Sequence, residues 1–304
     1  MNIHANDFGK VAVVMGGWSS ERNISIESGN AVLQGLRDEG ISAQAIDMNK
    51  NILETLKNGN FDRVFNVVHG RGGEDGQLQG ALEVLKLPYT GSNVIGSAIA
   101  MDKYRTKLIW QSLGIPTPGF ALIDDENQLR EAEELGFPLM IKAALEGSSI
   151  GIEKADNAEE LNRSWNSVRK YKSHVIAEKW IEGEEYSASI LGNTVLPIVH
   201  LKASNKFYDY EAKYISKSTE YSVPCGLDEK QEKESMELCL RAFKASGAAG
   251  WGRVDFLIDS ENRNWLIEVN TVPGMTKRSL FPMAAEAAGI NFNQLVRRIL
   301  ENTI

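Results

Sequence analysis

The sequence is poor in the features that mark disulfide-stabilised, membrane-spanning or polyanion-binding proteins. It contains only two cysteines, Cys225 and Cys239, which are too few for a disulfide framework and lack the spacing of metal ligands. No apolar run approaches the roughly 18 residues that a membrane span requires. The start of the chain is polar, and Val11–Met15 is too short for the core of a signal peptide. We therefore expect a soluble, cytoplasmic protein with no membrane partner.

The chain also lacks a surplus of positive charge. Its 33 lysines and arginines are outnumbered by 41 aspartates and glutamates, which leaves a formal net charge of −8. A nucleic-acid-binding protein uses a basic surface to neutralise phosphates, so we expect no nucleic-acid partner. Hydrophobic residues make up 42% of the 304 residues, which is ordinary for a folded protein with a large core. Any phosphate that this protein binds must be held by a few well-placed cations.

Two common nucleotide-binding signatures are missing. There is no Walker A motif, because Gly9-Lys10 is followed by valine rather than by serine or threonine. The dinucleotide fingerprint is absent as well, because Gly70-Arg71-Gly72 lacks a third glycine three residues later. A different Gly/Ser loop lies at 146–151 between two predicted strands. Backbone N–H groups in such a loop can bind phosphate, so this segment is the better candidate.

Strand and helix signals alternate along the first ninety or so residues. Three apolar runs predict strands, at Val11–Met15, Ala43–Met48 and Val64–Val68. Helical patterns follow each of them, which favours a parallel sheet covered on both faces. Ligands of such sheets bind beyond the carboxyl ends of the strands, where Gly-rich loops occur here at 16–21 and 69–76. We expect residues 1–94 to form an N-terminal, substrate-binding α/β domain.

The remaining sequence is typical of two α+β units. We expect a central unit at 95–183, which contains the Gly/Ser loop and a charged helix at Asp124–Leu135. A C-terminal unit at 184–304 begins with two predicted strands, Tyr186–Leu191 and Val195–Leu201, joined in a tight hairpin. The length of the chain alone suggests about two domains, whereas this organisation indicates three.

The most informative segment is a second predicted hairpin, formed by Arg253–Asp259 and Trp265–Asn270. Both segments alternate between apolar and polar residues with period two, as half-buried strands do. In the second segment the alternation predicts that Trp265, Ile267 and Val269 lie on the apolar face. A half-exposed sheet whose polar face meets water would show the same alternation, so the pattern alone does not establish a site.

A four-residue loop sets the register of this hairpin. It places Asp255 opposite Glu268, and Arg253 opposite Asn270. Directly opposed like charges are destabilising, so a cation is expected to offset the two carboxylates. Arg253 is one candidate. A divalent cation is the better one, because Mg²⁺ is typically held by one or two carboxylates together with substrate phosphates.

These residues resemble the ATP-grasp superfamily, and the whole chain resembles its D-alanine–D-alanine ligase family. The motifs that carry the resemblance follow the family order: Gly16-Gly17-x-Ser-x-Glu21, His69-Gly-Arg-Gly-Gly-Glu-Asp-Gly76, Met101-Asp-Lys103, Tyr208-Asp-Tyr-Glu-Ala-Lys-Tyr214, Gly250-Trp-Gly-Arg-Val-Asp255, Glu268-x-Asn270 and Gly274-Met-Thr-x-x-Ser279. The resemblance implies an α/β and α+β fold, in which a parallel-sheet (pre-ATP-grasp) domain precedes two α+β subdomains that clasp ATP. The irregular stretch at about 203–224 would be a lid that excludes water.

The family resemblance also implies an activity. ATP would phosphorylate the carboxylate of one D-alanine, and the amine of a second D-alanine would attack the acyl phosphate. The product, D-alanyl-D-alanine, is a precursor for peptidoglycan and thus for the cell wall and cell shape. The alternatives are a D-alanine–D-lactate ligase, another ATP-grasp carboxylate–amine ligase, and a non-catalytic nucleotide-binding module. We expect a homodimer that uses D-alanine and ATP.

The same resemblance implies the residues of the site. Asp255, Glu268 and Asn270 would hold two Mg²⁺ ions, with Mn²⁺ as a substitute. The positions that match ATP-binding residues are Lys103, Lys142, Ser148, Glu178, Lys179, Trp180, Ile181, Glu185 and Lys213, with Glu178 at adenine and Glu185 at ribose. The positions that match D-alanine-binding residues are Glu21, His69, Lys213, Arg253, Gly274 and Ser279. The catalytic positions are Glu21, Ser148, Tyr214, Arg253, Gly274 and Ser279.

Individual roles follow from the resemblance. Glu21 would pair with the ammonium of the first D-alanine, in a network with Ser148 and Tyr214, and His69 would lie near its carboxylate. Arg253 and the Gly274 N–H would stabilise the oxyanion of the tetrahedral intermediate. Two further positions, Lys213 and Ser279, would contact phosphate and the carboxylate of the second D-alanine.

Overall fold

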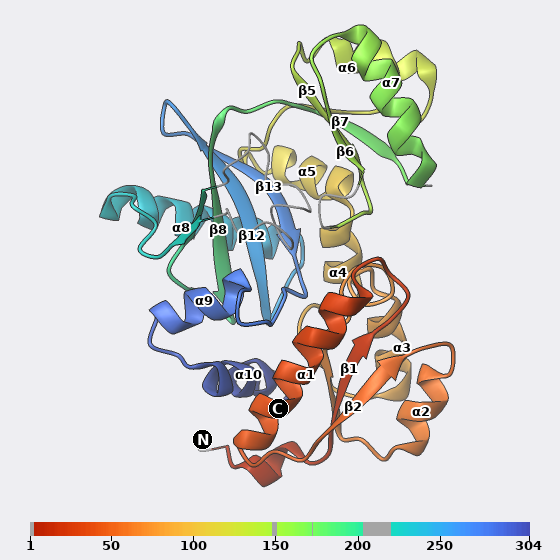
Figure 1. The fold of residues 1–304 in the computed structure, drawn as a ribbon, viewed down its shortest axis with the longest axis vertical. Coiled ribbons are helices and arrows are strands. Elements are labelled where there is room, and N and C mark those ends of the chain that lie inside the picture. The colour runs from red at the N-terminus through yellow and green to blue at the C-terminus, as the bar shows by residue number, and fades with distance from the viewer. Residues whose placement is uncertain (1–2, 148–150, 172, 203–219) are drawn as a thin grey trace.

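The computed structural model of the chain describes residues 3–147, 151–171, 173–202 and 220–304. Three sheets follow one another along the longest axis of the molecule (Figure 1). A three-stranded sheet from the N-terminal segment lies at one end, a four-stranded sheet from the central segment lies at the other, and a six-stranded sheet lies between them. Among the described helices, none combines the length and the apolar character needed to cross a bilayer.

The N-terminal segment forms the predicted parallel sheet. Its elements are η1 (Ala5–Phe8), β1 (Val11–Gly16), α1 (Arg22–Asp38), β2 (Ala43–Met48), α2 (Ile52–Asn58), β3 (Arg63–Asn66) and α3 (Gln77–Leu85). The strand order is β2-β1-β3, and both pairings are parallel. Every residue of the central strand β1 is buried, which is why it reads as an unbroken apolar run. Two further helices, α4 (Val94–Met101) and α5 (Lys103–Ser112), lead to the central segment.

The central segment forms an antiparallel sheet in the order β4-β7-β5-β6. Its elements are β4 (Phe120–Leu122), η2 (Glu126–Gln128), α6 (Leu129–Glu133), β5 (Leu139–Ala143), β6 (Ile152–Ala155), α7 (Ala158–Val168), η3 (Arg169–Tyr171) and β7 (Val175–Lys179). The predicted helix at Asp124–Leu135 is wrong in its extent. The Asp125 carboxylate accepts from the Asn127 N–H at 2.8 Å, so a capped 3-10 turn precedes a short α-helix.

The C-terminal segment forms an antiparallel sheet in the order β11-β10-β8-β12-β13, with β9 paired to β8. Its elements are β8 (Gly183–Leu191), β9 (Thr194–Val195), β10 (Val199–Lys202), β11 (Glu220–Ser222), α8 (Glu229–Ala245), β12 (Trp251–Asp259), β13 (Asn264–Asn270), α9 (Leu280–Ala287) and α10 (Phe292–Glu301). The tight turn after Leu191 is confirmed, because Leu191 pairs with Thr194. The predicted single strand Val195–Leu201 is wrong. It is two strands, separated at Pro197, which has no N–H for a sheet ladder.

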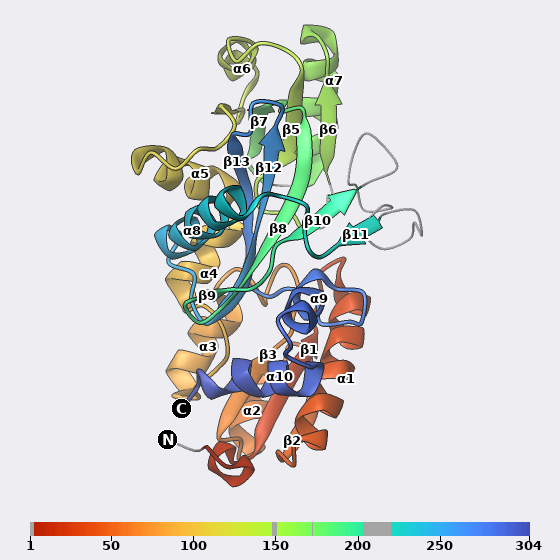
Figure 2. The same ribbon diagram turned by 90° about the vertical axis from the view of Figure 1, so that its left-hand side faces the viewer.

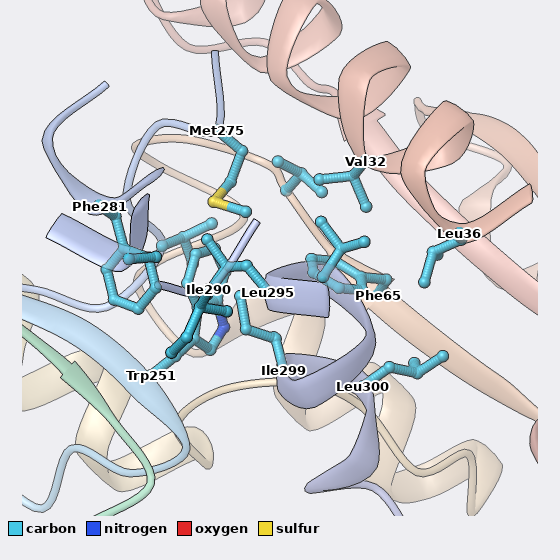
Figure 3. Packing of buried hydrophobic residues seen from close by; sticks show 14 of the residues in the cluster. Val32, Leu36, Phe65, Trp251, Met275, Phe281, Ile290, Leu295, Ile299 and Leu300 are labelled. Carbon is cyan, nitrogen blue, oxygen red and sulfur yellow. The ribbon is translucent and has the colours of Figure 1, made fainter. Parts of the chain in front are cut away.

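The C-terminal helices return to the N-terminal sheet. Figures 1 and 2 show α10 beside α1, toward the end of the molecule that also holds both termini, and α9 between α10 and the six-stranded sheet. The close-up in Figure 3 shows one apolar cluster that joins Val32 and Phe65 of the N-terminal segment to Trp251, Phe281 and residues of α10. This packing places the segment between β13 and α9 next to the carboxyl ends of β1 and β3. The domain boundaries near 94 and 183 stay predictions, as does the lid, since residues 203–219 lie outside the described part.

Candidate active site

The β12–β13 hairpin has the predicted register at its polar end. Asp255 pairs with Glu268, and Arg253 pairs with Asn270. Between Asp255 and Phe256 the register shifts by one residue, so Phe256 faces Leu266. The predicted apolar face of β13 is therefore wrong in part. Leu266 and Val269 are the buried residues of this strand, because the extra residue interrupts the alternation.

Each carboxylate of this pair has a cationic partner. Arg253 Nη2 donates to Asp255 Oδ2 at 2.6 Å. The buried Ser187 hydroxyl accepts from Arg253 Nε at 2.9 Å and donates to Asp255 Oδ1 at 2.6 Å. Lys103 Nζ lies 3.2 Å from Glu268 Oε2 and donates to the Glu146 carbonyl at 2.7 Å. Two separate cations thus offset the repulsion that the register creates.

Asn270 completes an oxygen-rich corner of the hairpin. Its Oδ1 atom is buried and receives no hydrogen bond from any described residue. Buried acceptors are normally satisfied, so an unpaired one beside two carboxylates fits a hard cation that prefers oxygen ligands. The described residues contain no cluster of three or more His, Cys, Asp or Glu side chains with metal-site geometry. The third ligand of the predicted set is an amide, so a set of two carboxylates and one amide fits Mg²⁺ chemically.

A cavity of about 310 Å³ lies in front of this corner. Eight of the predicted site residues line it: Glu21, His69, Lys103, Arg253, Glu268, Asn270, Gly274 and Ser279. They come from the loops after β1 and β3, from α5, from the β12–β13 hairpin and from the segment before α9. Residues up to 258 positions apart therefore meet in one enclosure that has the size of a small-molecule site.

Glu21 lies where two glycines leave room for its carboxylate. A Cβ atom on Gly70 would lie 2.8 Å from Glu21 Oε2, and one on Gly147 would lie 3.0 Å from the same oxygen. Gly70 also has a φ of +70°, a conformation that favours glycine. The Gly-rich loop after β3 and the start of the Gly/Ser loop thus both approach Glu21.

His69 is held by both ring nitrogens. Nδ1 lies 2.9 Å from the Val272 carbonyl, which can only accept, so Nδ1 carries the proton. Nε2 is then an acceptor, 3.2 Å from the Ser28 hydroxyl, which itself accepts from the Met275 N–H at 3.0 Å. Burial lowers the pKa of His69 to about 4, and Arg253 contributes to that shift. His69 is therefore a neutral link between the N-terminal sheet and the segment before α9.

Glu74 also lines the cavity, although the sequence motifs gave it no role. Its Oε1 atom lies 3.9 Å from His69 Nδ1. Burial raises the pKa of Glu74 well above its usual value, and the nearby Glu21 carboxylate raises it further. The sequence feature that could have indicated a role for Glu74 is its place in the Gly-rich loop that follows β3.

The turn before α9 brings Gly274 and Ser279 together. A Cβ on Gly274 would lie 2.8 Å from Ser279 Oγ, so only glycine fits there without a shift. Ser279 Oγ accepts from the Thr276 N–H at 3.0 Å. Ser279 is also the residue that precedes α9, and its side chain does not cap that helix. The N-terminus of α9 therefore lies beside the cavity with a side-chain hydroxyl next to it.

A second cluster of predicted residues lies in the central sheet. Lys142 Nζ donates to Glu178 Oε2 at 2.8 Å, and both side chains are buried. Lys107, which the sequence motifs did not assign, lies 3.4 Å from the other oxygen of Glu178. The sequence pattern did not indicate a role for Lys107, because nothing in the sequence of α5 reveals that this lysine contacts β7.

The other predicted ATP-binding residues that the structure describes do not line the cavity. Lys179 Nζ donates to the carbonyls of Gly136 and Phe137, at 2.8 and 3.1 Å. The Trp180 ring lies beside Lys154, with Nζ 5.7 Å from the ring centre. Ile181 follows as a partly exposed residue, and Glu185 lies on β8 opposite Leu201. Ser148, Lys213 and Tyr214 lie outside the described residues, so their predicted roles stay predictions.

Two family models match the chain. The model for the D-ala D-ala ligase C-terminus matches residues 109–301, and the one for the N-terminus matches residues 49–92. The chain belongs to the D-alanine–D-alanine ligase family. It is 52% identical to a D-alanine–D-alanine ligase of Methylococcus capsulatus, over 98% of this chain and 97% of that protein. It is 51% identical to D-alanine–D-alanine ligase B of Pseudomonas syringae pv. tomato, over 99% and 95%.

A solved structure supports the same assignment. The chain resembles D-alanine–D-alanine ligase from Bacillus anthracis complexed with ATP, with a TM-score of 0.86, 33% identity and 97% coverage of both chains. The predicted family and fold class are thereby confirmed.

Proposed function

We propose that this chain uses ATP to join two D-alanine molecules into D-alanyl-D-alanine, by way of a D-alanyl phosphate, as a step in the supply of peptidoglycan precursor. The observation that carries the proposal is the cavity itself. It combines a carboxylate from the loop between β1 and α1, Glu21, with the oxygen-rich corner at Glu268 and Asn270. Family membership and the likeness to an ATP-bound ligase support the use of ATP.

The chemistry requires activation of a carboxylate. A free carboxylate is a poor acyl donor until one of its oxygens becomes part of a phosphate leaving group. Asp255, Glu268 and Asn270 would hold Mg²⁺, which when bound neutralises the phosphates of ATP. Lys103, whose ammonium lies 3.2 Å from Glu268, would bind phosphate at the same corner. The two positive side chains Lys103 and Arg253 would then serve the transferred phosphate and the developing oxyanion respectively.

The first D-alanine is proposed to bind at Glu21. Its ammonium group would pair with the carboxylate that lies between Gly70 and Gly147. Neutral His69 would position the Val272 carbonyl and the Ser28 hydroxyl rather than carry charge, because both ring nitrogens are engaged. The substrate carboxylate would then face Arg253 and the phosphate.

The second D-alanine is proposed to bind near the N-terminus of α9. A helix N-terminus favours an anion, and the first N–H groups of α9 receive no cap from Ser279. The carboxylate of the second substrate would bind there with the Ser279 hydroxyl. Its amine would attack the acyl phosphate, and the Gly274 N–H would donate to the oxyanion that forms.

The direct test is incubation of the protein with ATP, Mg²⁺ and D-alanine, followed by chromatography for the dipeptide and an assay of ADP. We expect D-alanyl-D-alanine and ADP in equal amounts, and almost none with Glu21→Gln. Parallel reactions contain D-lactate or D-serine beside D-alanine. No dipeptide, or more ADP release with D-lactate than with D-alanine alone at neutral pH, would contradict the proposal.

We also propose that the chain works in the cytoplasm as a homodimer. Two large apolar side chains are exposed on the neighbouring helices α3 and α4, Val84 at 83% and Ile95 at 65%. Light scattering should give a mass of twice 33.6 kDa. A monomer at micromolar concentration would contradict the dimer.

A further inference from the structure

Lys107 is a fully buried lysine that the proposed reaction does not use. It lies on α5, and its side chain has no exposed surface. Lysine is almost never buried completely without partners, because removing an ammonium group from water is costly. Its Nζ donates to Thr117 Oγ1 at 2.6 Å and lies 3.4 Å from Glu178 Oε1. Burial lowers the pKa of Lys107 to about 8, and Glu178 opposes that shift.

Glu178 has one oxygen that is hydrogen bonded and one that, within the described part of the chain, is held only by its ion pair with Lys107. Oε2 accepts from Lys142 at 2.8 Å, whereas Oε1 is buried and receives no hydrogen bond from the described residues. Burial would raise the pKa of Glu178, but Lys107 and Lys142 outweigh it and hold the pKa below its usual value. A carboxylate oxygen has two lone pairs, so Oε1 can accept a hydrogen bond from a ligand while it keeps its ion pair with Lys107.

Lys107 is itself fixed from the opposite side. Thr117 Oγ1 accepts from Lys107 and donates to the Leu266 carbonyl at 2.8 Å, while the Leu266 N–H donates to the Pro116 carbonyl at 2.9 Å. Leu266 lies on β13, two residues before the proposed metal ligand Glu268. The Lys107 ammonium therefore connects Glu178 on β7 to the strand that holds the metal site.

The two lysines around Glu178 differ in what else they can do. Lys142 matches an ATP-binding position, so its ammonium would be shared with the nucleotide. Lys107 is buried and held by Thr117, and it is assigned no contact with ATP. An exocyclic 6-amino group donates to a carboxylate, whereas a 6-oxo group only accepts and would meet an uncompensated negative charge.

We propose that Lys107 is a positioning residue that fixes Glu178 as an ionised acceptor for the 6-amino group of the purine, and thereby gives the enzyme its preference for 6-amino over 6-oxo nucleotides. The inference rests on the proposed adenine-binding role of Glu178. Without Lys107, the buried carboxylate would either take up a proton or turn toward Lys142. In both cases Oε1 no longer distinguishes an amino group from an oxo group.

The test compares ATP with ITP, which carries a 6-oxo group, in steady-state assays at saturating D-alanine. We expect Lys107→Met to lower kcat/KM for ATP by about tenfold, the weight of one charge-assisted hydrogen bond, and to change that for ITP little. The ATP/ITP ratio should then fall by about tenfold, while the KM for D-alanine is unchanged. Lys10→Met is the matched control, because the Lys10 ammonium also donates to a protein oxygen, the Gly59 carbonyl, but lies in the N-terminal domain.

Thr117 offers variants that leave every charge in place. Thr117→Val removes the hydroxyl that holds Lys107 and should lower the ATP/ITP ratio in the same direction. Thr117→Ser keeps a hydroxyl and should restore the ratio. These variants keep the inference testable if Lys107→Met does not fold. An unchanged ratio in both Thr117→Val and a folded Lys107→Met, judged by thermal melting, would overturn it.

Glu178→Gln separates this inference from the proposed adenine site. An amide can donate to a 6-oxo group, so this variant should lose the preference for ATP. If it retains the preference, the adenine role of Glu178 is wrong and the role of Lys107 falls with it. If Glu178→Gln loses the preference while Lys107→Met and Thr117→Val keep it, only the role of Lys107 is wrong. In the Glu178→Gln background, Lys107→Met should cause no further loss.

Discussion

The ammonium group of Lys103 lies 3.2 Å from Glu268 Oε2, at the point where the first turn of α5 meets the end of β13. The Lys103 N–H and Nζ also donate to the Ala144 and Glu146 carbonyls, at 3.1 and 2.7 Å. Lys103 thus connects the metal-site strand with the segment that enters the Gly/Ser loop. A phosphate chain that binds both a metal at Glu268 and the Gly/Ser loop would have Lys103 beside it.

Glu268→Gln should nearly abolish the ligase reaction. The amide keeps the shape of the side chain but removes the charge that the proposed Mg²⁺ ions require, so we expect kcat to fall by about a hundredfold or more. Coupled ADP release over a range of Mg²⁺ concentrations measures the effect, and the variant should need more Mg²⁺ for its residual activity.

Glu261→Gln is the control for that variant. Glu261 lies in the loop of the same hairpin, is largely exposed, and has its carboxylate 3.2 Å from Arg263 Nη1. Exposed ion pairs contribute little to stability, so this variant should behave as wild type. Retention of full activity by Glu268→Gln would remove Glu268 from the metal site.

The polar end of the β12–β13 hairpin was predictable because two local signals agree there. Alternation places Asp255 and Glu268 on the polar faces of their strands, and the four-residue loop sets their register. The bulge near Ile267 was not predictable, because one extra residue leaves no mark in the alternation of a short strand. The bulge makes Leu266 rather than Ile267 the buried residue, and the Leu266 carbonyl accepts a hydrogen bond from the Thr117 hydroxyl.

Contacts that depend on the packing of distant segments were beyond the sequence pattern. His69 bonds the Val272 carbonyl across 203 positions, and this contact exists because α9 and α10 pack against the N-terminal sheet. Lys107 meets Glu178 only because the fold brings α5 to β7, 71 positions further along the chain. Motifs reveal which residue types a reaction needs, whereas tertiary packing decides which of them touch.

Burial of neutral His69 should make the protein sensitive to acid. Its pKa falls from 6.5 to about 4 on folding, so the folded state prefers the neutral ring. The stabilisation is present above pH 6.5 and is lost as the pH falls from 6.5 to about 4. The shift corresponds to about 3 kcal/mol. Urea unfolding between pH 7 and pH 4 should show this loss in the wild type and not in His69→Gln. Parallel losses in the two proteins would contradict a buried neutral histidine.

Glu74→Gln should stabilise the unliganded protein at alkaline pH. Burial and the nearby Glu21 raise the pKa of Glu74, so the folded state prefers its protonated form. The stabilisation from this group is present below pH 4.5 and is lost as the pH rises through the raised pKa. The neutral glutamine avoids that loss. Thermal melting should therefore give equal Tm values near pH 4 and a higher Tm for the variant at pH 8. Glu54→Gln, on the exposed face of α2, should show no such difference.

Gly70→Ala should damage substrate binding more than it damages the fold. The new Cβ would lie 2.8 Å from Glu21 Oε2, so the carboxylate must move away from the position proposed for the substrate ammonium. A displacement of about 1 Å in a positioning group can cost up to a hundredfold in rate, and we expect kcat/KM for D-alanine to fall by at least about tenfold. Steady-state assays with varied D-alanine measure this loss.

Gly192→Ala isolates the backbone effect, because both glycines have positive φ, +63° at Gly192 and +70° at Gly70. Apart from its two chain neighbours, no described residue lies within 4 Å of a Cβ at Gly192. Both variants should lose about 1 kcal/mol of stability, since an L-residue is strained in this region. Only Gly70→Ala should also lose activity, because only there does the methyl group meet Glu21. Equal kcat/KM in the two variants would show that Glu21 tolerates displacement and does not position the first substrate.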